Sequence, residues 1–191
     1  MNLERLLVLL VATIAITSVR AADISSAAQA RIGHLHCGDA SLIATTAYLV
    51  VDGEDRQTLS QRIVLTSAGR RVPIVLCGDG RSLHQPFLKD APVLDAAVTG
   101  WACLSAAGGK AYVYVVYICT ESLSRPDCEG VRREWVRLFD TRGKPLNAGF
   151  PHEGQRTSEM MKKLGLGRYV NDGAPLKDVD DPLGGENSAG N

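Results

Sequence analysis

Apolar and polar residues alternate along several stretches of the chain, as they do in β-strands that bury one face. The clearest strand is predicted at 111–119, a run of β-branched and aromatic residues without Pro or Gly. The paired Gly108-Gly109 before it predicts a tight hairpin turn from a preceding strand at 93–104. A third strand is expected at 134–139, after a polar loop. We expect these three strands to form the centre of a β-sheet.

Shorter strands are predicted before this hairpin, and a single helix after it. The strands are expected at 32–39, 42–51, 58–66 and 72–77, separated by turn signals such as an Asp-Gly pair. Residues 78–92 are expected to form an irregular connection. The helix is expected at 155–164, because Lys162 and Lys163 suit its C-terminal dipole and Gly165 can end it. The pattern predicts a mainly β fold, an antiparallel sandwich, meander or barrel of about seven to nine strands with one C-terminal helix.

The two ends of the chain are expected to lie outside the folded domain. Residues 1–21 have the parts of a cleavable signal peptide: a basic residue, an apolar run too short to span a bilayer, and small residues before the cleavage point. Residues 171–191 are rich in glycine and acidic side chains and are predicted to be disordered. A single β-rich domain is left at 22–170. We therefore expect an exported protein of the periplasm without a membrane anchor.

The five cysteines permit disulfide bonds in an exported chain, and the odd number leaves one cysteine that is either free or bonded to a second chain. Cys119 and Cys128 bracket a short loop between two predicted strands, so we expect them to form one bond. Cys37, Cys77 and Cys103 are left to supply the second bond, and of their pairings we favour Cys37–Cys77.

The position of the predicted turn also sets the register of the central hairpin. If the chain turns about residues 107–108, Cys103 lies opposite Tyr112. Cys119 then points to the other face of the sheet, because side chains alternate along a strand. This register argues against a bond between Cys103 and Cys119.

The charges of the whole chain are balanced, with 21 basic and 21 acidic residues. Nonspecific nucleic-acid binding and electrostatic membrane binding both depend on an excess of positive charge. The balance therefore argues against both functions.

Candidate catalytic and metal-binding residues are few. His34 and His36 share a face of a predicted strand, where two imidazoles can bind one metal ion. The other histidines, His84 and His152, lie on unrelated loops, so exposed histidines without a metal are the favoured interpretation. The chain contains neither a G-x-S-x-G motif nor an S-x-x-K pair, which would indicate a nucleophilic serine. We expect no enzyme, no metal and no cofactor.

The polar loop and the strand after it offer a candidate protein-binding patch. Arg133 and Trp135 belong to the residue types most enriched at interface hot spots. Glu121, Arg125 and Asp127 lie on the loop that the predicted disulfide would stiffen, and a stiff loop loses little entropy on binding. We expect these five residues to contact a protein partner.

Two resemblances suggest what that partner is. The combination of a cleavable signal peptide, a compact β domain, a few cysteines and a polar tail resembles periplasmic immunity proteins of interbacterial toxin systems. The segment SAAGGKAY at 105–112 resembles the Ser/Gly-rich inhibitory loop of the membrane-associated C-type lysozyme inhibitor family. Both resemblances imply a non-enzymatic protein that blocks the active site of an antibacterial toxin or cell-wall hydrolase. The alternative is a small-ligand or envelope-assembly binding module with a pocket lined by Trp101, Tyr112 and Tyr114.

Overall fold

The computed structural model describes residues 28–51, 55–74, 82–85, 88–94, 96–119, 133–148 and 154–180. In chain order, the elements are β1 (Gln29–Cys37), β2 (Ala40–Val51), β3 (Asp55–Ser67), β4 (Arg70–Ile74), β5 (Ser82–Gln85), β6 (Leu88–Leu94), β7 (Ala96–Ser105), β8 (Ala111–Cys119), β9 (Glu134–Asp140), α1 (Gly154–Lys163), α2 (Gly167–Asp172) and β10 (Lys177–Asp178).

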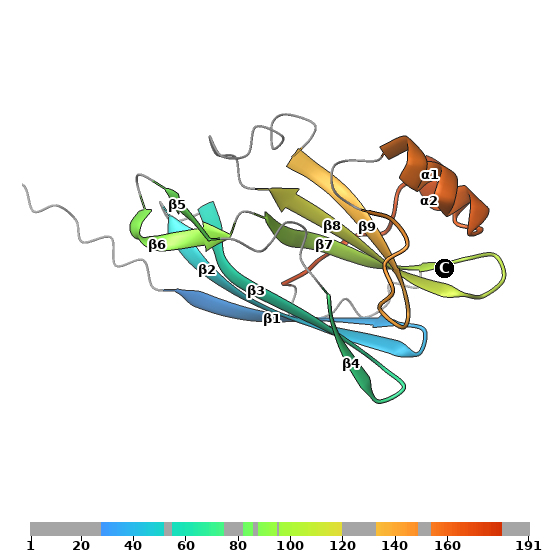
Figure 1. Cartoon of the computed structure of the whole chain (residues 1–191), viewed down its shortest axis with the longest axis horizontal. Helices are drawn as coiled ribbons and strands as arrows, with labels where there is room; N and C mark the ends of the chain where they lie inside the picture. Colours follow the sequence, from blue (N-terminus) through green and yellow to red (C-terminus); the bar gives the residue numbers. More distant parts are fainter. Residues whose placement is uncertain are drawn as a thin grey trace, which may run out of the picture.

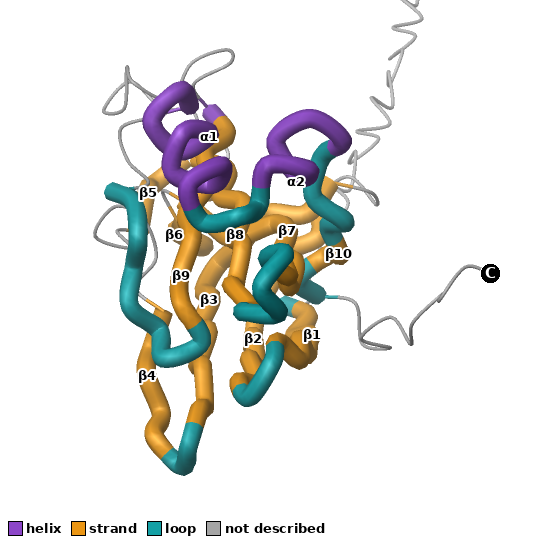
Figure 2. The backbone as a smooth tube through the Cα atoms, turned by 90° about the vertical axis from the view of Figure 1, so that its right-hand side faces the viewer, coloured by secondary structure: helices purple, strands orange, loops and turns teal. Residues whose placement is uncertain are grey.

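The strands form two antiparallel sheets of four strands each and a separate hairpin (Figure 1). The first sheet has the order β1-β2-β3-β4, and the second has the order β10-β7-β8-β9. The second sheet lies between the first sheet and the two helices (Figures 1 and 2). The predicted mainly β fold with a C-terminal helix is therefore confirmed, in the form of a sandwich. Residues 78–92 differ from the expected irregular connection, because they contain β5 and part of β6, which pair with each other.

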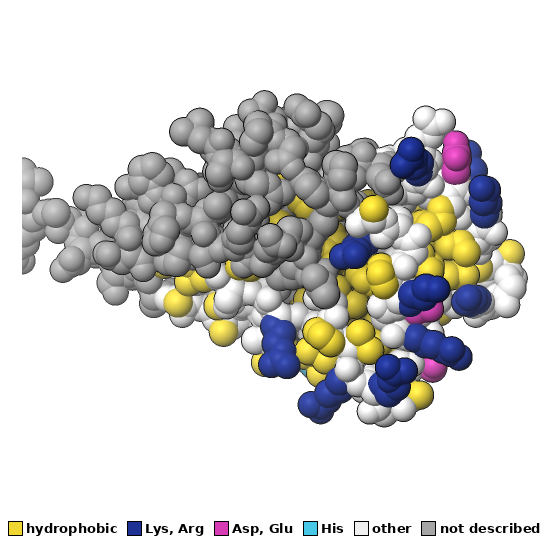
Figure 3. Space-filling model, viewed as in Figure 1, with side chains coloured by type: hydrophobic (Ala, Val, Ile, Leu, Met, Phe, Trp, Pro, Cys, Tyr) yellow, Lys and Arg dark blue, Asp and Glu magenta, His cyan; other side chains and the backbone are white. Residues whose placement is uncertain are grey.

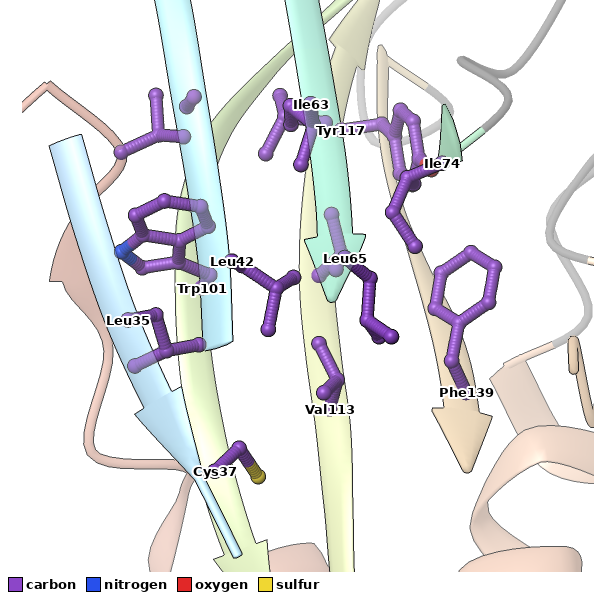
Figure 4. Close-up of a cluster of buried hydrophobic side chains, with 14 of the residues drawn as sticks. Leu35, Cys37, Leu42, Ile63, Leu65, Ile74, Trp101, Val113, Tyr117 and Phe139 are labelled. Carbon is purple, nitrogen blue, oxygen red and sulfur yellow. The ribbon is translucent and has the colours of Figure 1, made fainter. Parts of the chain in front are cut away.

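Side chains from both sheets fill the space between them (Figure 4). Leu42 and Leu65 of the first sheet and Trp101, Val113 and Tyr117 of the second belong to one buried cluster. All five are no more than 1% exposed. Burying a large apolar side chain stabilises a fold by about 1.5–3 kcal/mol. This layer is therefore the main core of the protein.

A second apolar layer lies on the other side of the second sheet. Leu104, Tyr112 and Leu138 point from β7, β8 and β9 toward the helices, where they pack with Met161 and Leu166. Both faces of β8 are consequently buried, which explains why its sequence is a nearly continuous apolar run rather than an alternating one.

The β7–β8 hairpin pairs one residue away from the predicted register. Cys103 lies opposite Val113 and not opposite Tyr112, because the strands are joined by a five-residue loop at 106–110 rather than a two-residue turn. A shift of one residue exchanges the two faces of a strand. Cys103 and Cys119 therefore both belong to the core between the sheets, and the prediction that they point to opposite faces is wrong.

A disulfide bond between Cys37 and Cys103 joins β1 to β7 across the sandwich. The predicted Cys37–Cys77 bond is therefore wrong, because the packing of the two sheets brings β1 and β7 together and places Cys37 next to Cys103. Cys119 is also disulfide-bonded. Cys77 and Cys128 lie outside the described residues, so the Cys119–Cys128 bond stays a prediction.

Residues 173–180, called the C-terminal strap below, run along the edge of the second sheet. Within the strap, β10 pairs with β7. Val179 is almost completely buried, and its N–H donates a hydrogen bond of 3.1 Å to the carbonyl of Thr99. The prediction of disorder from residue 171 onward is therefore wrong for 171–180, because backbone pairing and one apolar anchor hold this segment. Residues 181–191 lie outside the described part of the chain.

Two side-chain amides complete the edges of the second sheet. Gln61 of β3 donates to the carbonyl of Val98 and accepts from its N–H, both at 2.8 Å. Asn147 accepts a hydrogen bond of 2.8 Å from the N–H of Leu138 and donates one of 2.9 Å to the carbonyl of Val136. Each amide thus takes the place of a neighbouring strand.

Replacing Asn147 by alanine is expected to lower the free energy of unfolding by about 2 kcal/mol, because backbone groups of β9 lose their partners. The amide also donates to the hydroxyl of Thr157 in α1 (3.1 Å), so the helix loses a connection to the sheet. Asn147→Asp keeps the acceptor for Leu138 and removes both donors, so we expect an intermediate loss. Denaturant unfolding of the three proteins measures the effect. Equal stability of all three would contradict the proposed role of the amide.

Candidate functional site

The outer face of the first sheet, called the open face below, is covered by no described helix or strand over residues 32–45 and 62–73. Ile32 is 51% exposed and Ile43 is 43% exposed on this face. The β5–β6 hairpin lies near the opposite end of β3 from the β3–β4 turn (Figure 1). The second sheet, in contrast, is packed on both faces, so the open face is the available surface of the sandwich.

Cross-strand pairing arranges the open face in three rows. The central row crosses all four strands through His34, Ile43, Val64 and Pro73. The flanking rows contain Ile32, Thr45 and Arg62 on one side and His36, Ser41, Thr66 and Arg71 on the other. A stripe that is mostly apolar therefore crosses the sheet between two more polar rows.

A groove of about 370 Å³ lies over the β2, β3 and β4 part of these rows. Ile43, Val64 and Pro73 come from the central row, while Arg62 and Arg71 come from the two flanking rows. The flanking rows are four residues apart along a strand, a separation of about 13 Å. The groove thus combines an apolar centre with one guanidinium group on each side.

Positive charge dominates the open face. Within 29–50 and 56–74 the only acidic residue is Asp39, in the β1–β2 turn. Its carboxylate accepts a hydrogen bond from the hydroxyl of Ser67 (3.2 Å), and hydrogen bonds from Thr141 and Ser67 lower the pKa of Asp39 below its usual value. Among the described residues, no ion pair joins Arg62 or Arg71 to a carboxylate. Over residues 32–45 and 62–73 the open face therefore presents Arg62 and Arg71 with Asp39 as the single acidic residue of these ranges.

His34 and His36 share the open face, because Leu35 and Cys37 between and after them point into the core. No group of three His, Cys, Asp or Glu side chains that could hold a metal ion occurs in the described ranges. The arrangement gives two exposed imidazoles, His34 at the end of the central row and His36 in a flanking row.

One residue of the predicted protein-binding patch, Trp135, is buried and cannot contact a partner. Trp135 is 1% exposed and stacks on Tyr117 in the core, with ring centroids 5.9 Å apart. The reason is that Trp135 lies directly opposite Tyr117 on the neighbouring strand and shares its inward face. Arg133 is exposed at the start of β9. The other predicted contacts, Glu121, Arg125 and Asp127, lie outside the described residues.

The predicted pocket between Trp101, Tyr112 and Tyr114 does not exist. Trp101 lies in the core between the sheets, whereas Tyr112 and Tyr114 pack under the helices on the opposite face. The one-residue difference in the hairpin register separates them.

A cavity of about 600 Å³ lies at one end of the sandwich. Its lining includes Tyr48, Arg56, Arg133 and Asp180, and the Asp180 carboxylate lies 3.3 Å from the Arg56 guanidinium. Burial raises the pKa of Tyr48, and the nearby Asp180 carboxylate adds to the effect. The cavity therefore offers a neutral phenol beside an ion pair, a lining suited to a polar molecule.

The loop that resembles a lysozyme-inhibitor loop projects at the end of the β7–β8 hairpin (Figure 1). Added Cβ atoms at Gly108 and Gly109 would have no other atom within 4 Å, so the tip stands in open space. The N–H of Ala106 donates to the carbonyl of Lys110 (2.9 Å), which closes the loop. The Lys110 ammonium lies 5.2 Å from the centre of the Tyr112 ring. An exposed loop with one cation at its base is thus present.

Comparison with protein-family models, with curated proteins and with solved structures finds no match to this chain. No helix within the described residues is long and apolar enough to cross a membrane.

Proposed function

We propose that this protein is an exported, non-enzymatic binding protein that docks a protein partner on the open face. We further propose that it acts in the periplasm as an immunity protein or inhibitor, and that its partner is an antibacterial toxin or a cell-wall hydrolase. Binding of a folded partner over this face would block the partner's active site by covering it.

The observation that supports this proposal is that the second sheet is covered on both faces, whereas the first sheet is covered on only one. The second sheet buries apolar side chains on both faces, whereas the first leaves Ile32, Ile43, Val64 and Pro73 on its outer face. Apolar residues gathered on an exposed surface and surrounded by polar groups are typical of protein interfaces. The projecting loop at 106–110 provides a second element of the kind that inhibitors insert into an active site.

Replacing Ile43 by glutamate is expected to weaken partner binding at least tenfold, because a charge would be buried on the central row of the interface. Folding should be nearly unchanged, since Ile43 is exposed in the free protein. Leu176→Glu is the matched control, because Leu176 is 50% exposed but lies on the strap.

The experiment uses the mature chain as bait for secreted toxins and envelope hydrolases, followed by an activity assay of each captured enzyme with and without the bait. Inhibition by the wild type and by Leu176→Glu, but not by Ile43→Glu, would support the proposal. Inhibition retained by Ile43→Glu would exclude the open face. If no captured enzyme is inhibited, the proposed function as an inhibitor is wrong.

The cavity at the end of the sandwich favours one alternative, a binding module for a small polar ligand. Thermal unfolding of the mature chain with a panel of amino acids and dicarboxylates tests it. An increase in Tm with one ligand class, lost in Arg56→Met, would support this function. Unchanged Tm with the whole panel would count against it.

A further inference from the structure

We propose that the groove on the open face binds an extended acidic segment of the partner protein with an apolar residue at its centre. The segment runs along the strand direction and places a carboxylate over Arg62, an apolar side chain over Val64 and a second carboxylate over Arg71. This inference rests on the proposed function, and it specifies the chemistry of the partner surface.

The spacing of the rows sets the pattern of the segment. Successive rows are two residues apart on each strand of the first sheet. In an extended chain, side chains two residues apart point to the same side with the same spacing. A segment with the pattern acidic–x–apolar–x–acidic therefore matches the three rows in one orientation.

The two arginines suit carboxylates in particular. A guanidinium group forms two parallel hydrogen bonds with one carboxylate, and it loses less hydration than an ammonium group on doing so. Arg62 and Arg71 are both exposed, and no described carboxylate neutralises either of them. Charge complementarity thus favours an acidic occupant.

Basic side chains also outnumber acidic ones among the described residues as a whole, which again favours an acidic occupant of the groove. Residues whose side chains the structure describes include fifteen Lys and Arg but only seven Asp and Glu. The whole chain is balanced because the remaining residues, among them Asp55 of β3 and Asp90 of β6, include fourteen acidic and six basic side chains. On the side of the molecule shown in Figure 3, Lys and Arg outnumber Asp and Glu. A local excess of exposed positive charge favours contact with an anionic segment of a partner.

Two other occupants fit less well. In a symmetric pair of copies the same patch would face itself, so arginines would meet arginines. Single-stranded nucleic acids are usually held by aromatic side chains that stack on the bases. Within 32–45 and 62–73 the sequence contains no Phe, Trp or Tyr. The apolar central row instead suits a protein side chain.

The test combines a charge reversal with synthetic probes. The double variant Arg62→Glu/Arg71→Glu is compared with Lys144→Glu/Lys163→Glu, which makes the same change of charge at two exposed lysines that do not line the groove. The probes are a peptide with the sequence Glu-Ser-Leu-Ser-Glu and its Gln-Ser-Leu-Ser-Gln counterpart, both capped at the ends. Binding to the isotope-labelled mature chain is followed by amide chemical shifts.

We expect the acidic peptide to shift amides of β2, β3 and β4, and to bind at least tenfold more tightly than the glutamine peptide. We also expect Arg62→Glu/Arg71→Glu to lose this binding, while Lys144→Glu/Lys163→Glu changes the affinity less than threefold. The captured enzyme partner should respond to the two variants in the same way.

Several results would overturn the inference. One is that both peptides bind with equal affinity, and another is that the two charge variants bind the acidic peptide equally well. The inference would also be wrong if the protein self-associates through the open face, or if this face prefers an oligonucleotide or anionic vesicles. If both variants capture and inhibit the partner equally, the groove does not bind an acidic segment of that partner, and the proposed function is unaffected. Loss of the proposed function would instead appear as the absence of any inhibited enzyme.

Discussion

A chain with both Cys37 and Cys103 replaced by alanine is expected to lose about 4 kcal/mol of its free energy of unfolding. The disulfide joins residues 66 positions apart. Closing a loop of that length restricts the unfolded chain by about this amount in the entropic model. Since whole domains are stable by only about 5–15 kcal/mol, this is the largest single effect that we expect. Denaturant unfolding of the protein under non-reducing conditions measures it.

The single variants separate the bond from the packing of its sulfur atoms. Either Cys37→Ala or Cys103→Ala breaks the bond, so each should lose nearly as much stability as the double variant. Losses that simply add, with about half from each residue, would show that packing rather than the covalent link provides the stabilisation.

Replacing Gly33 by alanine is expected to cost about 3 kcal/mol, at the upper end of the range for overpacked sites. A Cβ atom at this position would lie 1.9 Å from the carbonyl oxygen of Val179 and 3.3 Å from the Trp101 ring. Because the obstacle is backbone, the C-terminal strap has to move away from β1. The ion pairs of Asp180 at the end of the strap would be lost with it.

Two measurements identify this mechanism. Denaturant unfolding gives the loss of stability, and limited proteolysis should show early cleavage within the strap. Gly108→Ala is the control, because a Cβ there meets no atom within 4 Å. A Gly33→Ala protein that matches this control in both measurements would show that the strap does not depend on the contact.

Local patterns were sufficient to predict most strands and the first helix. The run 111–119 agrees with β8, and 155–164 differs from α1 by one residue at each end. These elements depend on residues that are neighbours in sequence, such as the β-branched run of β8. Elements that depend on distant contacts were missed. The strap is one of these, because β10 has only two residues and is held by β7.

The hairpin register shows how one local error propagates. Gly108-Gly109 indicates a turn but does not determine its length, and a five-residue loop in place of two residues exchanged the faces of the strand. The assignment of Cys103 and Cys119 to opposite faces and the predicted aromatic pocket were both wrong for this reason.

The open face was not identified because exposure depends on tertiary packing. Ile43 and Val64 have the same alternation as core residues, and either face of the first sheet could have been the covered one. The position of α1 and α2 on the second sheet decides which apolar residues stay accessible. Trp135 shows the converse error, because its neighbour across the strands, Tyr117, determines that it is buried.

The coverage of the sheet edges has a consequence for how the protein assembles. Along the free edge of β7, the strap and Gln61 occupy backbone groups, and Asn147 does the same along β9. At the edge of the first sheet, Pro73 lacks an N–H that another strand could use. Exposed strand edges are the usual starting points of aggregation. Both edges of the second sheet and the β4 edge of the first sheet are therefore protected against pairing with another strand.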